Sequence, residues 1–165
     1  MDRHIITALV SNKPGVLNRV AGLFSKRGFN IESLSVCATE DEHLSRMTIV
    51  AGGDDYTLDQ ITKQLAKLID VVKVTMLDSD KSIQRELLLI KIKVKPAQRP
   101  EIESVVNIYK AKSVDLSPAS MALEITGEPS KIDAFINVVK DYGIIELART
   151  GLTALQRGET CIKDE

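Results

Sequence analysis

The residues whose types and spacing could bind a small molecule lie at a junction between a strand-like run and a helical one. Ile5–Val10 is a short apolar run suited to a buried strand, and a helical apolar pattern begins at Val16. Between them stand Asn12, Pro14 and Gly15. The first N–H groups of a helix lack partners inside the helix and lie at the positive end of its dipole, so they can hold a carboxylate.

The residues of this junction suit one particular kind of ligand. The N–H groups of Gly15, Val16 and Leu17 would point outward, and Gly15 leaves room for a ligand to approach the backbone. Asn12 can offer its amide oxygen to an ammonium group and its amide N–H to a carboxylate. Together these groups predict a site for a free α-amino acid. The alternative is that Asn12 and Pro14 are only turn and cap residues. In either case we expect Pro14 to fit the first helical position, where its missing N–H is not needed.

A second polar residue, Asn30, begins the next strand-like run, Phe29–Ala38. That run contains neither Pro nor Lys, which usually protect an edge strand, so we expect it to pair with a second copy of the chain. Asn30 would then lie beside the dimer seam and complete a site begun by Asn12 of the partner chain. The alternative is an Asn that stabilises the turn after Gly28.

No other group of residues indicates a reaction or a metal. His4 and His43 have no ligand at a metal-binding spacing, and the acidic loop Glu40–Glu42 lacks the alternating oxygen ligands of a calcium loop. The sequence also lacks the glycine-rich phosphate motifs, the HExxH zinc motif and the GxSxG nucleophile motif. The sequence therefore indicates neither a metal site nor a catalytic nucleophile with a general base.

The composition is that of a globular protein with nearly balanced charge. The 165 residues are 44% hydrophobic and 27% charged, with 22 Lys and Arg against 23 Asp and Glu. Non-specific nucleic-acid binding is disfavoured because no basic field exists. No apolar run approaches the roughly 20 residues that cross a bilayer, so no membrane association is expected. Cys37 and Cys161 lack a CxxC partner, which indicates reduced thiols in a cytoplasmic protein.

The apolar periods predict the elements that position the junction. In the first half they follow the order βαββαβ, with helices after Gly15 and after Asp54–Asp55. The strands of this half are expected at residues 5–10, 29–38, 44–51 and 71–77. Residues 78–82 form a polar break and are the candidate linker. This division predicts one domain at 1–78 and a second at 79–165.

The second half repeats the same order. Strands are expected at residues 87–94, 113–116, 121–126 and 144–148, with helices within 96–110 and from Pro129. The tail at 150–165 is polar and is expected to be loosely ordered. The fold class is therefore α+β, with two consecutive ferredoxin-like βαββαβ units. Right-handed crossovers place the first strand of each unit between the third and fourth, and the second strand on an edge.

The same fold occurs in RNA recognition motifs, which stack bases on aromatic side chains of their central strands. The corresponding segments here are His4–Val10 and Leu44–Val50, and neither contains Phe, Tyr or Trp. Together with the balanced charge, this disfavours RNA binding.

Several segments resemble one known family. Asn12–Val20 resembles the opening of an ACT domain, the small-molecule regulatory module of amino-acid metabolism, so 1–78 is identified as an ACT regulatory domain. Gly22–Leu34 is similar to the small regulatory subunits of acetolactate synthase, also called acetohydroxyacid synthase. The similarity continues at residues 44–49, 84–87, 131–135 and 146–151, and so covers almost the whole chain. The domain at 79–165 is thereby the C-terminal ferredoxin-like domain of that family.

The resemblance implies a regulatory subunit without chemistry of its own. Such a subunit activates a large catalytic subunit and makes it sensitive to valine in branched-chain amino acid biosynthesis. Thiamine diphosphate, Mg²⁺ and FAD belong to the catalytic partner, so no cofactor is expected here. The effector is expected between the ACT domains of a homodimer. The implied contacts are Asn12, Pro14, Gly15, Val16 and Leu17 of one chain and Asn30 and Ile31 of the other.

Other classes of function remain open beside the regulatory subunit. A free-standing ACT-type sensor would bind an amino acid but act on another partner. A transcription regulator is disfavoured because no helix-turn-helix segment fits in the chain, and a self-sufficient enzyme is disfavoured further. The sequence does not indicate the docking surface for the large subunit, the preferred branched-chain amino acid or the role of the second domain.

Overall fold

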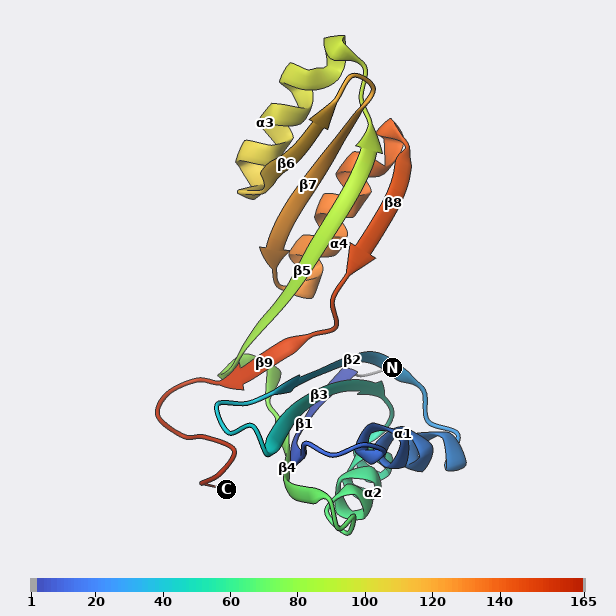
Figure 1. Ribbon diagram of the computed structural model, residues 1–165, viewed down its shortest axis with the longest axis vertical. Helices are drawn as coiled ribbons and strands as arrows, with labels where there is room; N and C mark the ends of the chain where they lie inside the picture. Colours follow the sequence, from blue (N-terminus) through green and yellow to red (C-terminus); the bar gives the residue numbers. More distant parts are fainter. Residues whose placement is uncertain (1–2, 165) are drawn as a thin grey trace. The chain divides into compact units, whose positions relative to one another are not determined.

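The structure, a computed structural model, describes residues 3–164 and divides the chain into two compact units. Unit 1 comprises the chain up to Gln84 together with the segment from Gly151 onward, and unit 2 comprises Arg85–Thr150. In each unit two helices cover one face of a sheet (Figure 1). The division expected from the sequence, 1–78 and 79–165, differs from this one chiefly in the segment after Thr150, which lies with unit 1.

Unit 1 has the expected βαββαβ order. Its elements are β1 (Arg3–Ser11), α1 (Val16–Lys26), β2 (Ile31–Ala38), β3 (Leu44–Gly52), α2 (Asp55–Leu65) and β4 (Val71–Leu77). The strand order is β2-β3-β1-β4, and neighbouring strands are antiparallel. The predicted position of β1 between β3 and β4 is therefore confirmed, and so is the position of β2 on an edge.

Local signals explain where the helices of unit 1 begin and end. The Asp54 carboxylate accepts a hydrogen bond of 2.7 Å from the Thr57 N–H, which caps α2 as expected. Gly28, with φ of 71°, follows the end of α1. The expectation that Pro14 occupies the first helical position is wrong, because α1 begins only at Val16. Gly15 caps the helix in a left-handed conformation, with φ of 85°, and this separates Pro14 from the helical turns.

The sheet of unit 1 is apolar on both faces in its two central strands. Ile6, Ala8 and Val10 of β1 pack with β3 residues against both helices. Alternate residues of β1 point to the opposite face, and of these Ile5 and Leu9 are also buried. That second face therefore needs its own cover, which the helices cannot supply.

The segment after Thr150 supplies this cover, so the expectation of a loosely ordered tail is wrong. It contains β9 (Thr153–Gln156), which pairs with β5. Leu152 and Ala154 are buried in a cluster completed by Ile5, Val50 and Leu77. The Leu152 N–H donates a hydrogen bond of 2.8 Å to the Ser33 hydroxyl of β2. Two alternating apolar residues are too short a pattern for periodicity to reveal, which is why sequence reasoning missed this strand.

Unit 2 confirms the second βαββαβ motif. Its elements are β5 (Ser82–Lys93, which begins in unit 1), η2 (Pro96–Gln98), α3 (Arg99–Tyr109), β6 (Lys112–Ser117), β7 (Ser120–Gly127), α4 (Pro129–Val139), η3 (Lys140–Tyr142) and β8 (Ile144–Arg149). The strand order is β6-β7-β5-β8, which matches that of unit 1. The predicted linker at residues 78–82 is ordered. It contains a short 3-10 turn, η1 (Ser79–Lys81), and its last residue, Ser82, is the first residue of β5.

Gly151 tests how tightly the segment after Thr150 fits against β2. A Cβ added at Gly151 would lie 2.5 Å from the Leu34 carbonyl oxygen, and backbone cannot move aside cheaply. We expect Gly151→Ala to lower the free energy of unfolding by about 1–3 kcal/mol. In the matched control, Gly22→Ala, a Cβ in the middle of α1 meets nothing within 4 Å and should add about 0.5–1 kcal/mol. Urea unfolding followed by circular dichroism measures both changes, and an unchanged midpoint for Gly151→Ala would contradict the close fit.

Candidate functional site

The loop after β1 is held in place by backbone hydrogen bonds to two distant segments. The Ser11 N–H donates to the Asp70 carbonyl at 2.8 Å, and the Asn12 N–H donates to the His43 carbonyl at 2.7 Å. The Asn12 side-chain amide donates to the Glu42 carbonyl at 2.9 Å. One of its two amide hydrogens is thus used structurally, which leaves the other hydrogen and the amide oxygen for a ligand.

The start of α1 has no capping side chain. Gly15 occupies the cap position there. The Val16 N–H makes only a long hydrogen bond, 3.4 Å, to the Lys13 carbonyl. The Val16 side chain is buried in the core, so this residue can contribute only its backbone, whereas Leu17 is 45% exposed. The uncapped turn is therefore suited to a carboxylate.

An ion pair that sequence reasoning missed lies beside this turn. The Arg19 guanidinium is 2.6 Å from the Asp70 carboxylate, and its other terminal nitrogen is 3.6 Å from where a Cβ on Gly15 would stand. Arg19 thus adds positive charge next to the helix N-terminus, and Asp70 neutralises part of it. The spacing of one helical turn between Gly15 and Arg19 was the available signal. Asp70 gave none, since its position depends on the end of α2 and on β4.

Asn30 and Ile31 lie at the opposite end of the same sheet. β1 and β2 both pair antiparallel with β3, so they run parallel to each other. Ser11 pairs with Leu44 at one end of β3, whereas Ile31 pairs with Ala51 near the other. Leu44 and Ala51 are seven residues apart, or about 23 Å at ~3.3 Å per residue. One chain therefore brings together Asn12 to Leu17 but does not bring Asn30 to them.

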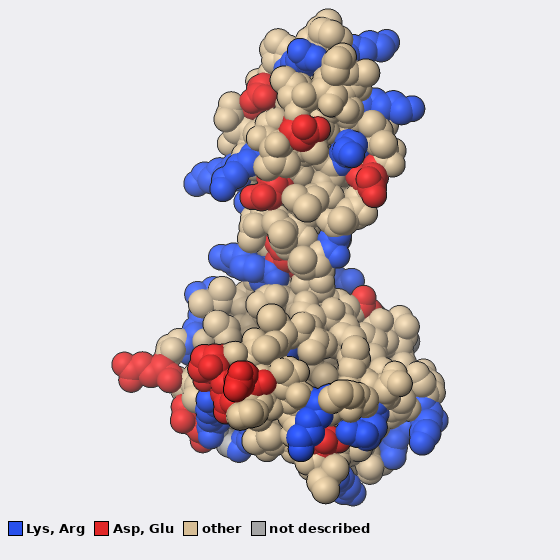
Figure 2. All heavy atoms as spheres, in the orientation of Figure 1, with Lys and Arg blue, Asp and Glu red and all other residues tan. Residues whose placement is uncertain are grey.

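The histidine, cysteine and acidic side chains in the described part of the chain are not grouped as metal ligands would be. Within residues 3–164, no group of three or more His, Cys, Asp or Glu side chains is arranged to hold a metal ion. His43 and the acidic loop Glu40–Glu42 are exposed, and Cys37 and Cys161 are free thiols. On the face drawn in Figure 2, side chains of both charge signs are mixed over each unit. Among the helices of the described chain, none is long and apolar enough to cross a membrane.

Comparisons with known sequences point to one family across both units. Residues 6–73 match the AHAS small subunit-like ACT domain, and residues 85–158 match the small subunit of acetolactate synthase. The chain is 52% identical to a probable acetolactate synthase small subunit of Methanothermobacter thermautotrophicus, over 95% of this chain and 94% of that one. It is 49% identical to an acetolactate synthase small subunit of Mycolicibacterium smegmatis, over 94% of this chain and 91% of the relative.

A solved structure is similar in fold over nearly the full length. The crystal structure of the acetolactate synthase small subunit from Thermotoga maritima aligns with a TM-score of 0.90 and 42% sequence identity. The alignment covers 97% of this chain and all of the other. The likeness therefore extends over both units and is not confined to the loop after β1.

Because the Asn12 side chain donates a hydrogen bond to the Glu42 carbonyl, we expect Asn12→Asp and Asn18→Asp to change the free energy of unfolding in opposite directions. Asn12→Asp replaces the donor by a carboxylate that faces the Glu42 carbonyl, and should lower the free energy of unfolding by about 1 kcal/mol. Asn18→Asp, in the first turn of α1, should instead raise it by about 0.3–1 kcal/mol, because a negative charge is favourable at a helix N-terminus. Urea unfolding at pH 7 measures both, and equal shifts of the same sign would contradict the structural role of Asn12.

Proposed function

Because the chain belongs to the family of acetolactate synthase small subunits, we propose that it binds valine between the ACT domains of a homodimer and regulates a large catalytic subunit. In this proposal it activates the large subunit and confers feedback inhibition in branched-chain amino acid biosynthesis. The observation that carries the valine site is the uncapped first turn of α1 at Gly15, beside the anchored Asn12. The thiamine diphosphate, Mg²⁺ and FAD chemistry lies on the large subunit, and the complex works in the cytoplasm.

Each group of valine has a complement in this site. The carboxylate lies at the free N–H groups of the α1 start, where Arg19 adds positive charge. The Asn12 amide oxygen accepts a hydrogen bond from the ammonium group. The exposed part of Leu17 and, from the second chain, Ile31 supply the apolar contact. Valine has few heavy atoms, so we expect a Kd of roughly micromolar to millimolar.

The contact to the side chain sets the selectivity. Leucine and isoleucine should differ from valine by about 1–3 kcal/mol, the usual effect of one methylene in an apolar pocket. Glycine cannot fill the apolar part and should bind far more weakly.

The sheet register supports a site shared by two chains. Asn12 and Asn30 lie at opposite ends of one sheet. If two copies pair antiparallel along their β2 edges, the β2 start of one copy lies beside the β2 end of the other. That is the end at which the Asn12 loop lies, because Ala38 and Ser11 are both close to the start of β3. Asn30 and Ile31 of the second copy thus approach Asn12 of the first.

Regulation then follows from linkage. Valine bound across two chains stabilises the dimer arrangement that forms the site, and the large subunit responds because it binds that arrangement less productively. The size of the inhibition is limited by the difference in valine affinity between the two arrangements.

Mixing two defective variants tests whether the site spans two chains. Dimers of Asn12→Ala alone, or of Asn30→Ala alone, should bind valine weakly because every site lacks one contact. After dissociation and random reassociation, half of the dimers are mixed, and each mixed dimer has one intact site and one doubly altered site. Calorimetric titration should then recover about one quarter of the wild-type sites, since a two-fold interface contains two equivalent sites. A mixture that binds no better than its components contradicts the shared site, and glycine serves as the control ligand.

Gly15→Asp tests the carboxylate position together with the regulatory role. A Cβ at Gly15 would lie 3.6 Å from an Arg19 nitrogen, an ordinary contact, although the φ of 85° strains any residue other than glycine. The Asp side chain places a carboxylate where that of valine is proposed. We expect this variant to lose valine inhibition in an acetolactate assay with purified large subunit while it still activates that subunit. Gly15→Ala is the control. It places a side chain on the same left-handed backbone, and so causes the same strain, but it adds no charge and should keep much of the inhibition.

Two results of this assay would contradict the proposal. Unchanged valine sensitivity in Gly15→Asp would place the effector elsewhere. A wild-type chain that binds valine but does not activate the large subunit would favour a free-standing amino-acid sensor.

A further inference from the structure

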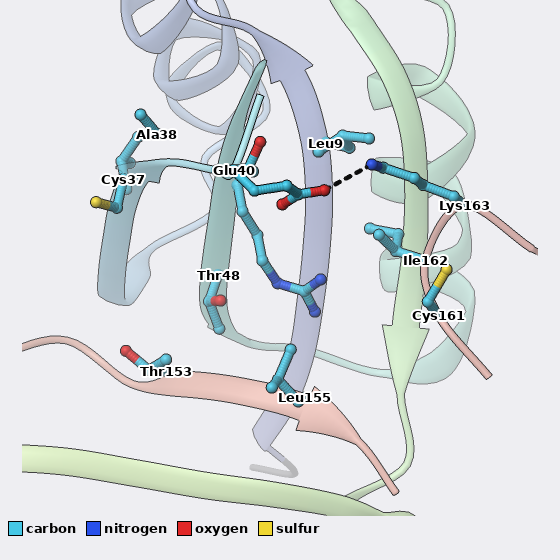
Figure 3. Close-up of a pocket in the computed structure, with 13 residues that line it drawn as sticks. Leu9, Cys37, Ala38, Glu40, Thr48, Thr153, Leu155, Cys161, Ile162 and Lys163 are labelled. Carbon is cyan, nitrogen blue, oxygen red and sulfur yellow. Dashed lines mark hydrogen bonds and ion pairs between the residues drawn. The ribbon is translucent and has the colours of Figure 1, made fainter. Parts of the chain in front are cut away.

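A cavity lies on the face of the unit 1 sheet that the helices do not cover. It has a volume of about 430 Å³, which is large enough for a small organic ligand. Its apolar walls come from the sheet and from the segment after Thr150: Leu9, Val36, Ala38, Leu155 and Ile162. Figure 3 shows Cys37 and Ala38 on one side of the pocket and Cys161, Ile162 and Lys163 on the other. The proposed valine site uses none of these residues.

Arg46 of β3 is the charged group in this cavity that lacks a counter-ion. Its guanidinium makes one hydrogen bond, 3.1 Å from a terminal nitrogen to the Ala154 carbonyl. Its Nε is buried and has no hydrogen-bond partner within residues 3–164, and no carboxylate there lies within ion-pair distance of the side chain. Burial lowers the pKa of Arg46 from its ordinary value but leaves it charged at neutral pH. A partly buried cation with free donors is suited to an anion.

The other charges near the cavity determine which anion fits. Glu40 and Lys163 both line it and pair with each other at 2.8 Å, as the dashed line in Figure 3 marks. Hydrogen bonding to Lys163 lowers the pKa of Glu40, so this carboxylate stays ionised and occupied. The cavity therefore has one unmatched positive charge and no free carboxylate for an ammonium group. Thr48 and Thr153 also line the cavity, and their hydroxyls can form hydrogen bonds with a polar atom of the ligand close to its anionic group.

We propose that this cavity binds a small monocarboxylate with a short aliphatic chain and no ammonium group. The carboxylate pairs with Arg46, and the aliphatic chain contacts the wall formed by Leu9, Leu155 and Ile162. An amino acid is disfavoured because its ammonium group would lie near the positive charges of Arg46 and Lys163, and the one carboxylate in the lining, that of Glu40, is already paired with Lys163. An inorganic phosphate is disfavoured because it leaves the apolar walls in contact with water.

A binding titration on the purified full chain tests this site without the large subunit and without valine. The probe is isovalerate, and the controls are acetate, which lacks the branched chain, and 3-methylbutanamide, which lacks the charge. We expect saturable binding of isovalerate near one site per chain, with a Kd of about 0.1–10 mM for so small a ligand. Both controls should bind at least about tenfold more weakly.

Two variants separate the Arg46 contact from general charge effects. Arg46→Gln should weaken isovalerate binding by about tenfold or more, because the counter-ion is lost. Lys73→Gln is the matched control: Lys73 lies in the same cross-strand row, opposite Leu9, but does not line the cavity. It should bind as the wild type does. Equal affinity in Arg46→Gln, or an equal loss in both variants, overturns the proposal.

The two cysteines give a readout that does not depend on a variant folding. They are the only cysteines in the chain, and both line this cavity. Isovalerate should slow the alkylation of Cys161 and Cys37 by iodoacetamide, as followed by peptide mass spectrometry, and the amide should not. The protection should persist in Gly15→Asp, which alters the proposed valine site and leaves the Asn12 hydrogen bond to the Glu42 carbonyl in place. Absence of both heat and protection overturns the inference, and so does protection by the amide that equals that of isovalerate.

Discussion

The central constraint on unit 1 is that its sheet is apolar on both faces. β1 and β3 bury side chains in both directions, so a single layer of helices cannot exclude water from the sheet. The second cover comes from the other end of the chain, where Leu152 and Ala154 complete a small cluster with Ile5, Val50 and Leu77. This requirement explains why the segment after Thr150 returns to unit 1. It also explains why that segment is tied to the sheet at Ser33 and Arg46.

The candidate valine site depends on the same sheet through its loop. Strand register determines where β1 ends, and hydrogen bonds to the Glu42 and His43 carbonyls then hold Asn12 in one position. The left-handed conformation of Gly15 starts the helix without a capping side chain, and burial of Val16 anchors that first turn in the core. The proposed binding groups are thus mostly backbone atoms whose positions are set by packing elsewhere. Such a site can be rigid although almost every residue that forms it is exposed.

Much of this arrangement could be predicted from the sequence, because strands and helices of six or more residues leave a clear period. β4, at Val71–Leu77, agrees with its expected bounds, and the edge position of β2 followed from the crossover rule. Features that depend on a few residues or on distant contacts were missed. Pro14 and Gly15 both suit a helix start, and only the backbone conformation decides between them. β9 has too few residues for a period, and the pair of Arg19 with Asp70 joins segments about fifty residues apart in sequence. The meeting of Asn12 and Asn30 requires a second chain, so it remains a prediction.

The proposed valine site and the cavity at Arg46 are connected by one short loop. Glu40 lines the cavity and pairs with Lys163, while the Glu42 and His43 carbonyls hold Asn12. Leu9, which also lines the cavity, lies three residues before Asn12 on β1. If both proposed ligands bind, a ligand at Arg46 that shifts Lys163 acts through Glu40 on the loop that holds Asn12. Coupling between two sites is reciprocal, so valine must change the affinity of the cavity by the same factor by which a ligand in the cavity changes the affinity for valine. In the two proposals taken together, the covering segment, needed first to exclude water from the sheet, is the part of the molecule through which a small carboxylate would modulate the response to the amino acid.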